Sequence, residues 1–136
     1  MTIALTKDSI DIGIVVRDAD AALAFYRDTL GFTDTGSMPM AGGGTMYRLL
    51  CGTTLVKIVA PDKTLPAAAP PGGIIGGYGY RYWTMTVSNL DEVTDRCNSN
   101  GYKVAIAPRE IRPGVRISMV EDPEGNWVEF LELAGS

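Results

Sequence analysis

Short runs of apolar residues divide the chain into segments with strand-like and helix-like patterns. The run "IDIGIVV" (residues 10–16) is typical of a β-strand, because β-branched side chains pack well on a pleated sheet. The next run, "RDADAALAFYRDTLGF", has apolar residues at helical spacing. Asp18 or Asp20 can cap the start of this helix, and Gly31 suits the left-handed residue that follows its end.

The same order of elements is predicted twice. Beyond the first helix, strands are expected over residues 33–40, 45–51 and 54–59. A segment rich in proline and glycine, residues 61–79, then interrupts all periodicity. After it come a strand, a helix and three strands, over residues 80–87, 89–102, 103–108, 115–122 and 126–133.

A βαβββ order that repeats at an offset of about seventy residues predicts two similar modules. We therefore expect an α+β fold with two tandem βαβββ modules, over about residues 8–60 and 80–133. Residues 61–79 would form a linker or lid between them. At 136 residues the chain is long enough for one domain with a sizeable core.

Composition narrows the classes of function. The chain has no histidine, which excludes catalytic triads with a histidine base and metal sites built on histidine. Its net charge is −4, and its lysines and arginines are scattered, so no basic stripe for nucleic acid is expected. We expect neither a signal peptide nor a membrane span, and hence a cytoplasmic protein. Cys51 and Cys97 lack the spacing of a metal site, which favours buried free thiols over a disulfide.

Four segments together resemble the vicinal oxygen chelate superfamily, which includes glyoxalase I, methylmalonyl-CoA epimerase, extradiol dioxygenases and bleomycin-resistance proteins. They are "DIGIVVRDADAALAFYRDTLGF", "LVKIVAP", "YWTMTVSNLDEV" and "EDPEGNWVEFLEL". The resemblance implies mixed sheets that curl into a cup-shaped cavity. In the family's enzymes this cup usually holds a divalent metal, bound by His or Gln, Glu, His and Glu.

By position, those four ligands fall on Asp11, Lys57, Tyr82 and Glu129, and only Glu129 matches the family's pattern. The resemblance also implies that the four residues meet at the floor of the cup. An ammonium group in place of a ligand would repel a divalent ion. We therefore predict that the usual metal site is lost, that Lys57 replaces part of its charge, and that the protein uses no cofactor.

Glu129 stands in the middle of an otherwise apolar strand face, where a carboxylate needs a partner or a role. In one interpretation Glu129 or Asp11 is a general base, with a pKa raised by burial and by a like-charged neighbour. Tyr82 and Lys57 would then hold a developing oxyanion, and Tyr82 or Lys57 would satisfy the acids at rest. In the other, the four residues are a relic ion-pair network beneath a pocket that only binds.

Candidate ligand contacts flank these residues. Trp127 and Tyr80 fall on the same strand faces as Glu129 and Tyr82, as walls of the cavity or as plain core residues. Ile74 and Ile75 lie in the uncharged loop, where they could cover an apolar ligand, form a dimer contact or belong to a simple linker. Around a Pro-Gly turn lie Arg109, Arg112 and Arg116, which are expected at a solvated hairpin tip or against an anionic group such as a carboxylate or a coenzyme A phosphate.

Three functions are consistent with this pattern. The first is a metal-independent isomerase, epimerase or lyase that moves a proton next to a carbonyl of a small, mostly apolar substrate. The second is a protein that sequesters a small molecule or antibiotic, as bleomycin-resistance proteins do. The third is a glyoxalase or dioxygenase with atypical metal ligands. In each case we expect a homodimer, and no nucleic-acid or membrane partner.

Overall fold

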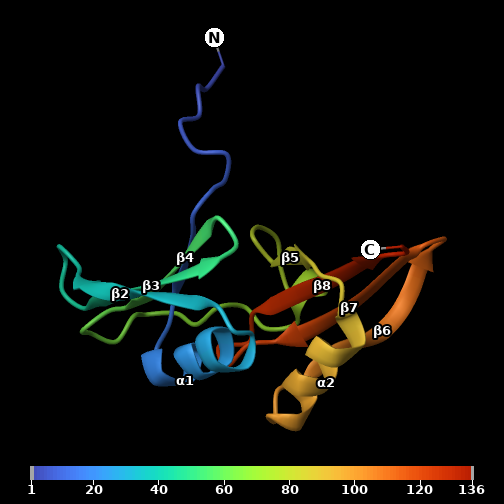
Figure 1. Cartoon of the computed structure of the whole chain (residues 1–136). Helices are drawn as coiled ribbons and strands as arrows, with labels where there is room; N and C mark the ends of the chain where they lie inside the picture. The colour runs from blue at the N-terminus through green and yellow to red at the C-terminus, as the bar shows by residue number, and fades with distance from the viewer. Residues whose placement is uncertain (1, 136) are drawn as a thin grey trace. The chain divides into compact units, whose positions relative to one another are not determined.

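The structure is a computed structural model that describes residues 2–135 and divides into two compact units, Met1–Leu65 and Pro66–Ser136. Each unit consists of a four-stranded sheet with one main helical segment (Figure 1). The predicted repeat and the predicted α+β class are therefore confirmed. Most of the proline-rich and glycine-rich segment belongs to the second unit.

The first unit runs in the order β1 (Ile12–Val15), α1 (Ala19–Leu23), η1 (Ala24–Thr29), β2 (Thr33–Pro39), β3 (Thr45–Cys51) and β4 (Thr54–Ala60). Its sheet has the order β1-β4-β3-β2, in which β1 pairs parallel with β4 and the other pairs are antiparallel. The parallel pair closes the βαβββ unit, since the last strand returns beside the first.

The first helix begins and ends where its signals predict. Asp18 accepts a hydrogen bond from the backbone N–H of Ala21, and Gly31 follows the helix with φ +83°. From Ala24 onward, however, the helix is a π-helix. There the Thr29 hydroxyl donates to the Ala24 carbonyl at 3.0 Å, five residues back. Apolar spacing predicts a helix but does not distinguish this wider turn.

The second unit runs in the order η2 (Gly73–Ile75), β5 (Tyr82–Thr86), α2 (Leu90–Ser99), β6 (Val104–Arg112), β7 (Val115–Glu121) and β8 (Trp127–Leu133). Its sheet, β5-β8-β7-β6, repeats the topology of the first, with β5 parallel to β8. The predicted end of β6 at residue 108 is wrong. Register shifts along the edge strand β6 accommodate Pro108, so the pairing continues to Arg112.

In each unit a helix covers one face of the sheet. Helix α1 contacts β4, and α2 contacts β6, β7 and β8. The covered face holds the fully buried core residues Val56 and Ile58 in the first unit and Val128 and Phe130 in the second. Because side chains alternate along a strand, Lys57 and Glu129 lie on the opposite face, which we call the non-helix face.

Both cysteines are free, as expected. Burial raises the pKa of the Cys97 thiol to about 11, so this thiol stays protonated and unreactive at neutral pH. Within residues 2–135, no helix has the length and apolar character needed to span a membrane.

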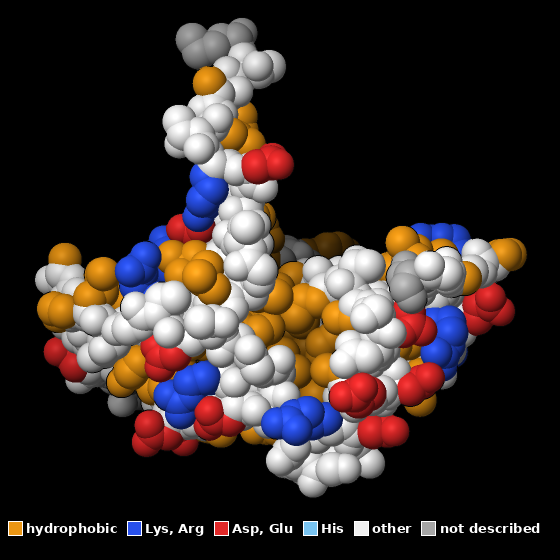
Figure 2. All heavy atoms as spheres, viewed as in Figure 1, with side chains coloured by type: hydrophobic (Ala, Val, Ile, Leu, Met, Phe, Trp, Pro, Cys, Tyr) orange, Lys and Arg blue, Asp and Glu red, His pale blue; other side chains and the backbone are white. Residues whose placement is uncertain are grey.

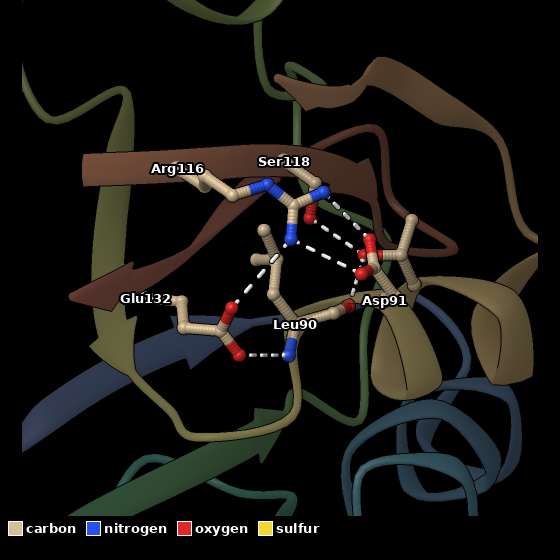
Figure 3. Close-up of polar contacts among 6 residues, drawn as sticks. Leu90, Asp91, Arg116, Ser118 and Glu132 are labelled. Atoms are coloured by element: carbon tan, nitrogen blue, oxygen red, sulfur yellow. Dashed lines mark hydrogen bonds and ion pairs between the residues drawn. The ribbon is translucent and has the colours of Figure 1, made fainter. Parts of the chain in front are cut away.

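A side chain from a neighbouring strand caps the start of α2. Asn89 makes no side-chain capping bond, and Glu132 of β8 accepts from the backbone N–H of Leu90 at 3.0 Å instead (Figure 3). Arg116 of β7 lies 3.5 Å from Glu132 and donates to both oxygens of Asp91, at 2.8 and 3.1 Å. Arg116 therefore ties α2 to the sheet. The expectation of a solvated tip is wrong for this residue, and the anionic groups that it meets are carboxylates of its own unit.

Replacement of Glu132 by alanine should destabilise the second unit by about 1 kcal/mol, because the first turn of α2 loses its cap. Urea unfolding followed by tryptophan fluorescence measures this unit specifically, since both tryptophans, Trp83 and Trp127, lie in it. Asp95→Ala, which removes an exposed carboxylate from the same helix, is the matched control. Equal losses in the two variants would show that the cap contributes nothing.

The second unit should become less stable in acid, because the ion pair between Arg116 and Asp91 is lost when Asp91 is protonated. Its hydrogen bond to Arg116 lowers the pKa of Asp91. A carboxylate whose pKa is lowered by folding stabilises the protein above its unfolded pKa of about 4, and this contribution is lost as the pH falls through the folded value. The difference in unfolding midpoint between the wild type and Asp91→Asn should therefore shrink between about pH 6 and pH 2. A constant difference would contradict this.

Candidate functional site

Strand register places Glu129 in the middle of a small grid on the non-helix face of the second unit. Thr84 of β5 lies opposite Glu129 on one side, and Met119 of β7 lies opposite it on the other. Met119 is buried, so an apolar side chain lies directly beside the carboxylate. The two flanking rows of this grid are Tyr82, Trp127 and Glu121, and Thr86, Leu131 and Ile117.

The carboxylate of Glu129 is held by a hydroxyl group. Thr84 Oγ1 donates to Glu129 Oε1 at 2.6 Å. The hydrogen bond that was expected from Tyr82 comes from Thr84 instead, because Tyr82 pairs with Trp127, one row away. Sequence reasoning missed Thr84, although a parallel register between the first and last strands of the module would have placed it opposite Glu129.

Trp127 is half-buried and lies one row from Glu129 on the same face. Its indole N–H donates to Glu121 at 3.3 Å. The loop before β5 crosses directly over the ring, since a Cβ atom added at Gly73 would lie 2.0 Å from the indole carbon Cδ2. Only glycine permits this approach, and its φ of +56° also disfavours other residues. The backbone of the loop therefore packs directly against the tryptophan ring.

Arg81 anchors this loop. Its guanidinium donates to the carbonyl of Gly73 at 2.6 Å and to those of Pro70 and Pro71 at 2.9 and 3.3 Å. Sequence reasoning did not single out Arg81. A lone arginine directly after a charge-free stretch, residues 65–80, is the signal that could have found it.

The other proposed ligand contacts of the second unit are exposed. Ile75 and Tyr80 are almost fully accessible, and Ile74 and Tyr82 are about half accessible. Tyr80 precedes β5 and does not enter the core, so its alternative interpretation as a core residue is wrong. The anchored loop thus presents apolar side chains that the second unit itself leaves uncovered.

In the first unit, Asp11 lies just before β1 and Lys57 lies on β4. Lys57 Nζ is 3.5 Å from Asp11 Oδ2, and Lys7 donates to the other carboxylate oxygen. The hydrogen bond from Lys7, together with the charge of Lys57, lowers the pKa of Asp11. The expected rise in the pKa of Asp11 is therefore wrong, because two ammonium groups rather than a second carboxylate surround it.

The four sequence-predicted residues thus form two pairs of neighbours in separate units. Asp11 contacts Lys57 in the first unit. Glu129 and Tyr82 occupy adjacent rows of the grid in the second unit. Glu129 is held by Thr84, and Lys57 is paired with Asp11, so each charged group has a partner within its own unit.

The donor set does not fit a divalent metal. Within residues 2–135, no group of three or more Cys, Asp or Glu side chains lies close enough to hold an ion. Asp11 is already shared by two ammonium groups, whose charge opposes a cation. A divalent ion of the first transition row takes three or four nitrogen, oxygen or sulfur donors, which these residues do not supply.

Positive charge is dispersed on the face that Figure 2 shows. Lysine and arginine side chains stand singly among aspartates and glutamates, without a continuous basic strip on that face.

The fold is shared with solved structures of known proteins. A glyoxalase family protein from Bacillus cereus superposes with a TM-score of 0.83 at 18% identity, covering 98% of this chain and 97% of that one. The antibiotic binding protein TnmS3 from Streptomyces sp. CB03234 gives 0.70 at 21% identity, with 98% and 99% covered. A lactoylglutathione lyase from Agrobacterium tumefaciens gives 0.65 at 25% identity, with 90% and 91% covered.

Comparison with curated proteins found no match to the sequence. A family model, described as Glyoxalase/Bleomycin resistance protein/Dioxygenase superfamily, matches residues 9–130. This match spans both units and includes Asp11, Lys57, Tyr82 and Glu129. The chain therefore belongs to the Glyoxalase/Bleomycin resistance protein/Dioxygenase superfamily.

Proposed function

We propose that the protein is a metal-independent enzyme that transfers a proton next to a carbonyl group of a small, mostly apolar substrate. The observation that carries this proposal is the Glu129 carboxylate, which is oriented by Thr84 and lies between that hydroxyl and the buried Met119. A carboxylate fixed by one hydrogen bond keeps a second oxygen for a substrate proton.

In the proposed reaction, Glu129 removes a proton from the carbon next to the carbonyl. The electron pair of the broken C–H bond moves onto the carbonyl oxygen and forms an enolate. Glu129 then returns the proton to another carbon, which completes an isomerisation. Proton and electrons balance within the substrate, so no co-reactant is needed.

The developing oxyanion must be stabilised by a hydrogen-bond donor or a cation. We assign this role to the hydroxyl of Tyr82, which lies one row from Glu129 in the same unit. Asp11 is assigned to hold Lys57 rather than to act as a base, because its lowered pKa makes it a poor proton acceptor. Trp127, Tyr80, Ile74 and Ile75 are assigned to the apolar part of the substrate.

Replacement of Glu129 by glutamine should reduce turnover on the protein's substrate by roughly 100-fold or more, since a general base contributes about 10²–10⁴-fold. A panel of apolar enolisable ketones and thioesters, scanned by proton exchange in deuterated water, would find the substrate. Thr84→Val should lower kcat less, because it frees the carboxylate without removing it.

Glu92→Gln is the matched control, because it removes an exposed carboxylate from α2 of the same unit. It should leave turnover unchanged. Exchange rates that are the same in the wild type and in Glu129→Gln would contradict the proposed role of Glu129.

Chelation of divalent metals should not affect this turnover. The reason is the donor set, in which Lys57 and Tyr82 replace ligands and Asp11 is paired with two lysines. The check is metal analysis of protein purified without chelator, followed by rate measurements before and after dialysis against EDTA. A stoichiometric divalent ion whose removal abolishes turnover would favour an enzyme with atypical metal ligands instead.

Sequestration of a small molecule is the second candidate. It is favoured by the exposed apolar side chains of the anchored loop, Ile74, Ile75 and Tyr80, which can cover a ligand without any chemistry. The two candidates differ in the role of Glu129. The enzyme needs this carboxylate as a base, whereas a protein that only sequesters a ligand carries out no reaction.

If the protein only sequesters its ligand, calorimetry should show tight binding of a flat apolar compound without conversion. Ile75→Ser should then weaken binding about tenfold, because the loss of a buried isoleucine contact costs roughly 1.5 kcal/mol or more. Glu129→Gln should leave the affinity unchanged. Conversion of the bound compound would exclude simple sequestration.

A further inference from the structure

Two cations stand directly opposite each other on the non-helix face of the first sheet. Arg48 of β3 is the register partner of Lys57 of β4, so both side chains lie on the same face. Like charges directly opposite each other destabilise a sheet. Since a folded protein gains nothing from this repulsion by itself, the pair points to an anion that offsets it.

Local carboxylates do not neutralise this pair. Asp11, which Lys57 shares with Lys7, is the only carboxylate within ion-pair distance of Lys57 among residues 2–135. Over the same residues, Arg48 has no carboxylate within 4.0 Å. With three positive groups, Lys7, Lys57 and Arg48, and one negative group, Asp11, the cluster keeps a net charge of +2 (3 − 1).

Open space adjoins the two cations. On the other side of Lys57, the register partner in β1 is Gly13, and a Cβ atom added there would meet no heavy atom within 4 Å. On the other side of Arg48, β2 has a bulge at Thr35 and Gly36, and a Cβ atom at Gly36 would also meet nothing. A side chain at either glycine would fill this space, so the sheet leaves it free beside the two positive charges.

We propose that Lys57 and Arg48 bind an oxyanion, the carboxylate or phosphate group of a small ligand, in the open space beside Gly13. A guanidinium offers two parallel N–H donors that match the two oxygens of such a group, and the ammonium adds a point charge. Both side chains are half-buried, which strengthens their interaction with an anion compared with fully exposed cations.

This inference goes beyond the proposed function and does not rest on it, because every residue of the oxyanion site lies in the first unit. It adds Arg48 as a binding residue and gives the class of ligand for this site, organic acids or phosphate esters. Anion binding is measured without turnover, so the two proposals can fail independently.

The test is an NMR titration of the whole chain with two probes, sodium phosphate and sodium benzoate, at ionic strength held constant with sodium chloride. Saturable shifts should be confined to the backbone amides of Gly13, Arg48, Lys57 and their neighbours. Preference for phosphate or for benzoate identifies the oxyanion. Absence of saturation by both probes, or shifts spread evenly over the surface, would overturn the inference.

Two variants and one control make the test specific. Arg48→Gln should weaken probe binding by about tenfold, the effect of one lost charge-assisted hydrogen bond. Gly13→Val, which places a side chain in the open space without needing an unusual φ, should block binding while both lysines and Arg48 remain. Lys63→Gln, which removes an exposed charge elsewhere in the unit, should change nothing.

If Lys63→Gln and Arg48→Gln weaken probe binding equally, net charge alone causes the effect and the site is contradicted. Unchanged binding in Gly13→Val would also contradict the site. Glu129→Gln should bind both probes like the wild type. If Glu129→Gln also turns over the substrate like the wild type, the proposed function fails while the oxyanion site stands. If Glu129→Gln loses turnover and the wild type binds neither probe, the proposed function stands and the oxyanion site fails.

Discussion

The parallel pairing of the first and last strands decides which chemistry each unit can present. In a βαβββ unit this pairing fixes which residues of the two strands stand side by side, and the helix covers one of the two faces. Shifting either pair by one residue would turn the polar side chains into the core. The positions of Glu129 beside Thr84, and of Lys57 beside Gly13, therefore follow from the register that the core enforces.

The same constraint explains why the two units differ in charge. Lys57 and Glu129 occupy equivalent places on the last strands of the two sheets, one residue from fully buried core positions. In the first unit the face carries two ammonium groups, a guanidinium and one carboxylate. In the second, a carboxylate is held by a hydroxyl group among apolar neighbours. The two units thus share one architecture while their exposed faces differ in chemistry.

Much of the fold can be predicted from the sequence, because the hydrophobic pattern is periodic and capping and turn residues mark where helices and strands begin and end. Asp18, Gly31 and the glycine-rich turns mark the ends of elements, and β3 begins and ends as predicted. The π-helix and the extension of β6 to Arg112 were not predictable, because they depend on hydrogen bonds and register shifts that apolar spacing does not encode.

The site was predicted less completely, for a physical reason. Matching positions to a family pattern identifies residues at equivalent places, such as Glu129 and Lys57, but it says nothing about their immediate partners. Thr84 and Arg81 make hydrogen bonds that are set by register and loop geometry, and register alone places Arg48 opposite Lys57. The pKa of Asp11 was predicted with the wrong sign because Lys7, which is not part of the family pattern, supplies its closest contact.

The way in which Arg81 holds the loop has a consequence for how the protein can change. Within residues 2–135, Arg81 donates hydrogen bonds only to main-chain oxygens of residues 70, 71 and 73, so the anchoring does not depend on which side chains the loop carries. Ile74 and Ile75 can therefore be exchanged while the backbone keeps its course across Trp127. Such a loop is a natural place to retarget ligand preference, by evolution or by directed mutagenesis, without reshaping the sheet beneath it.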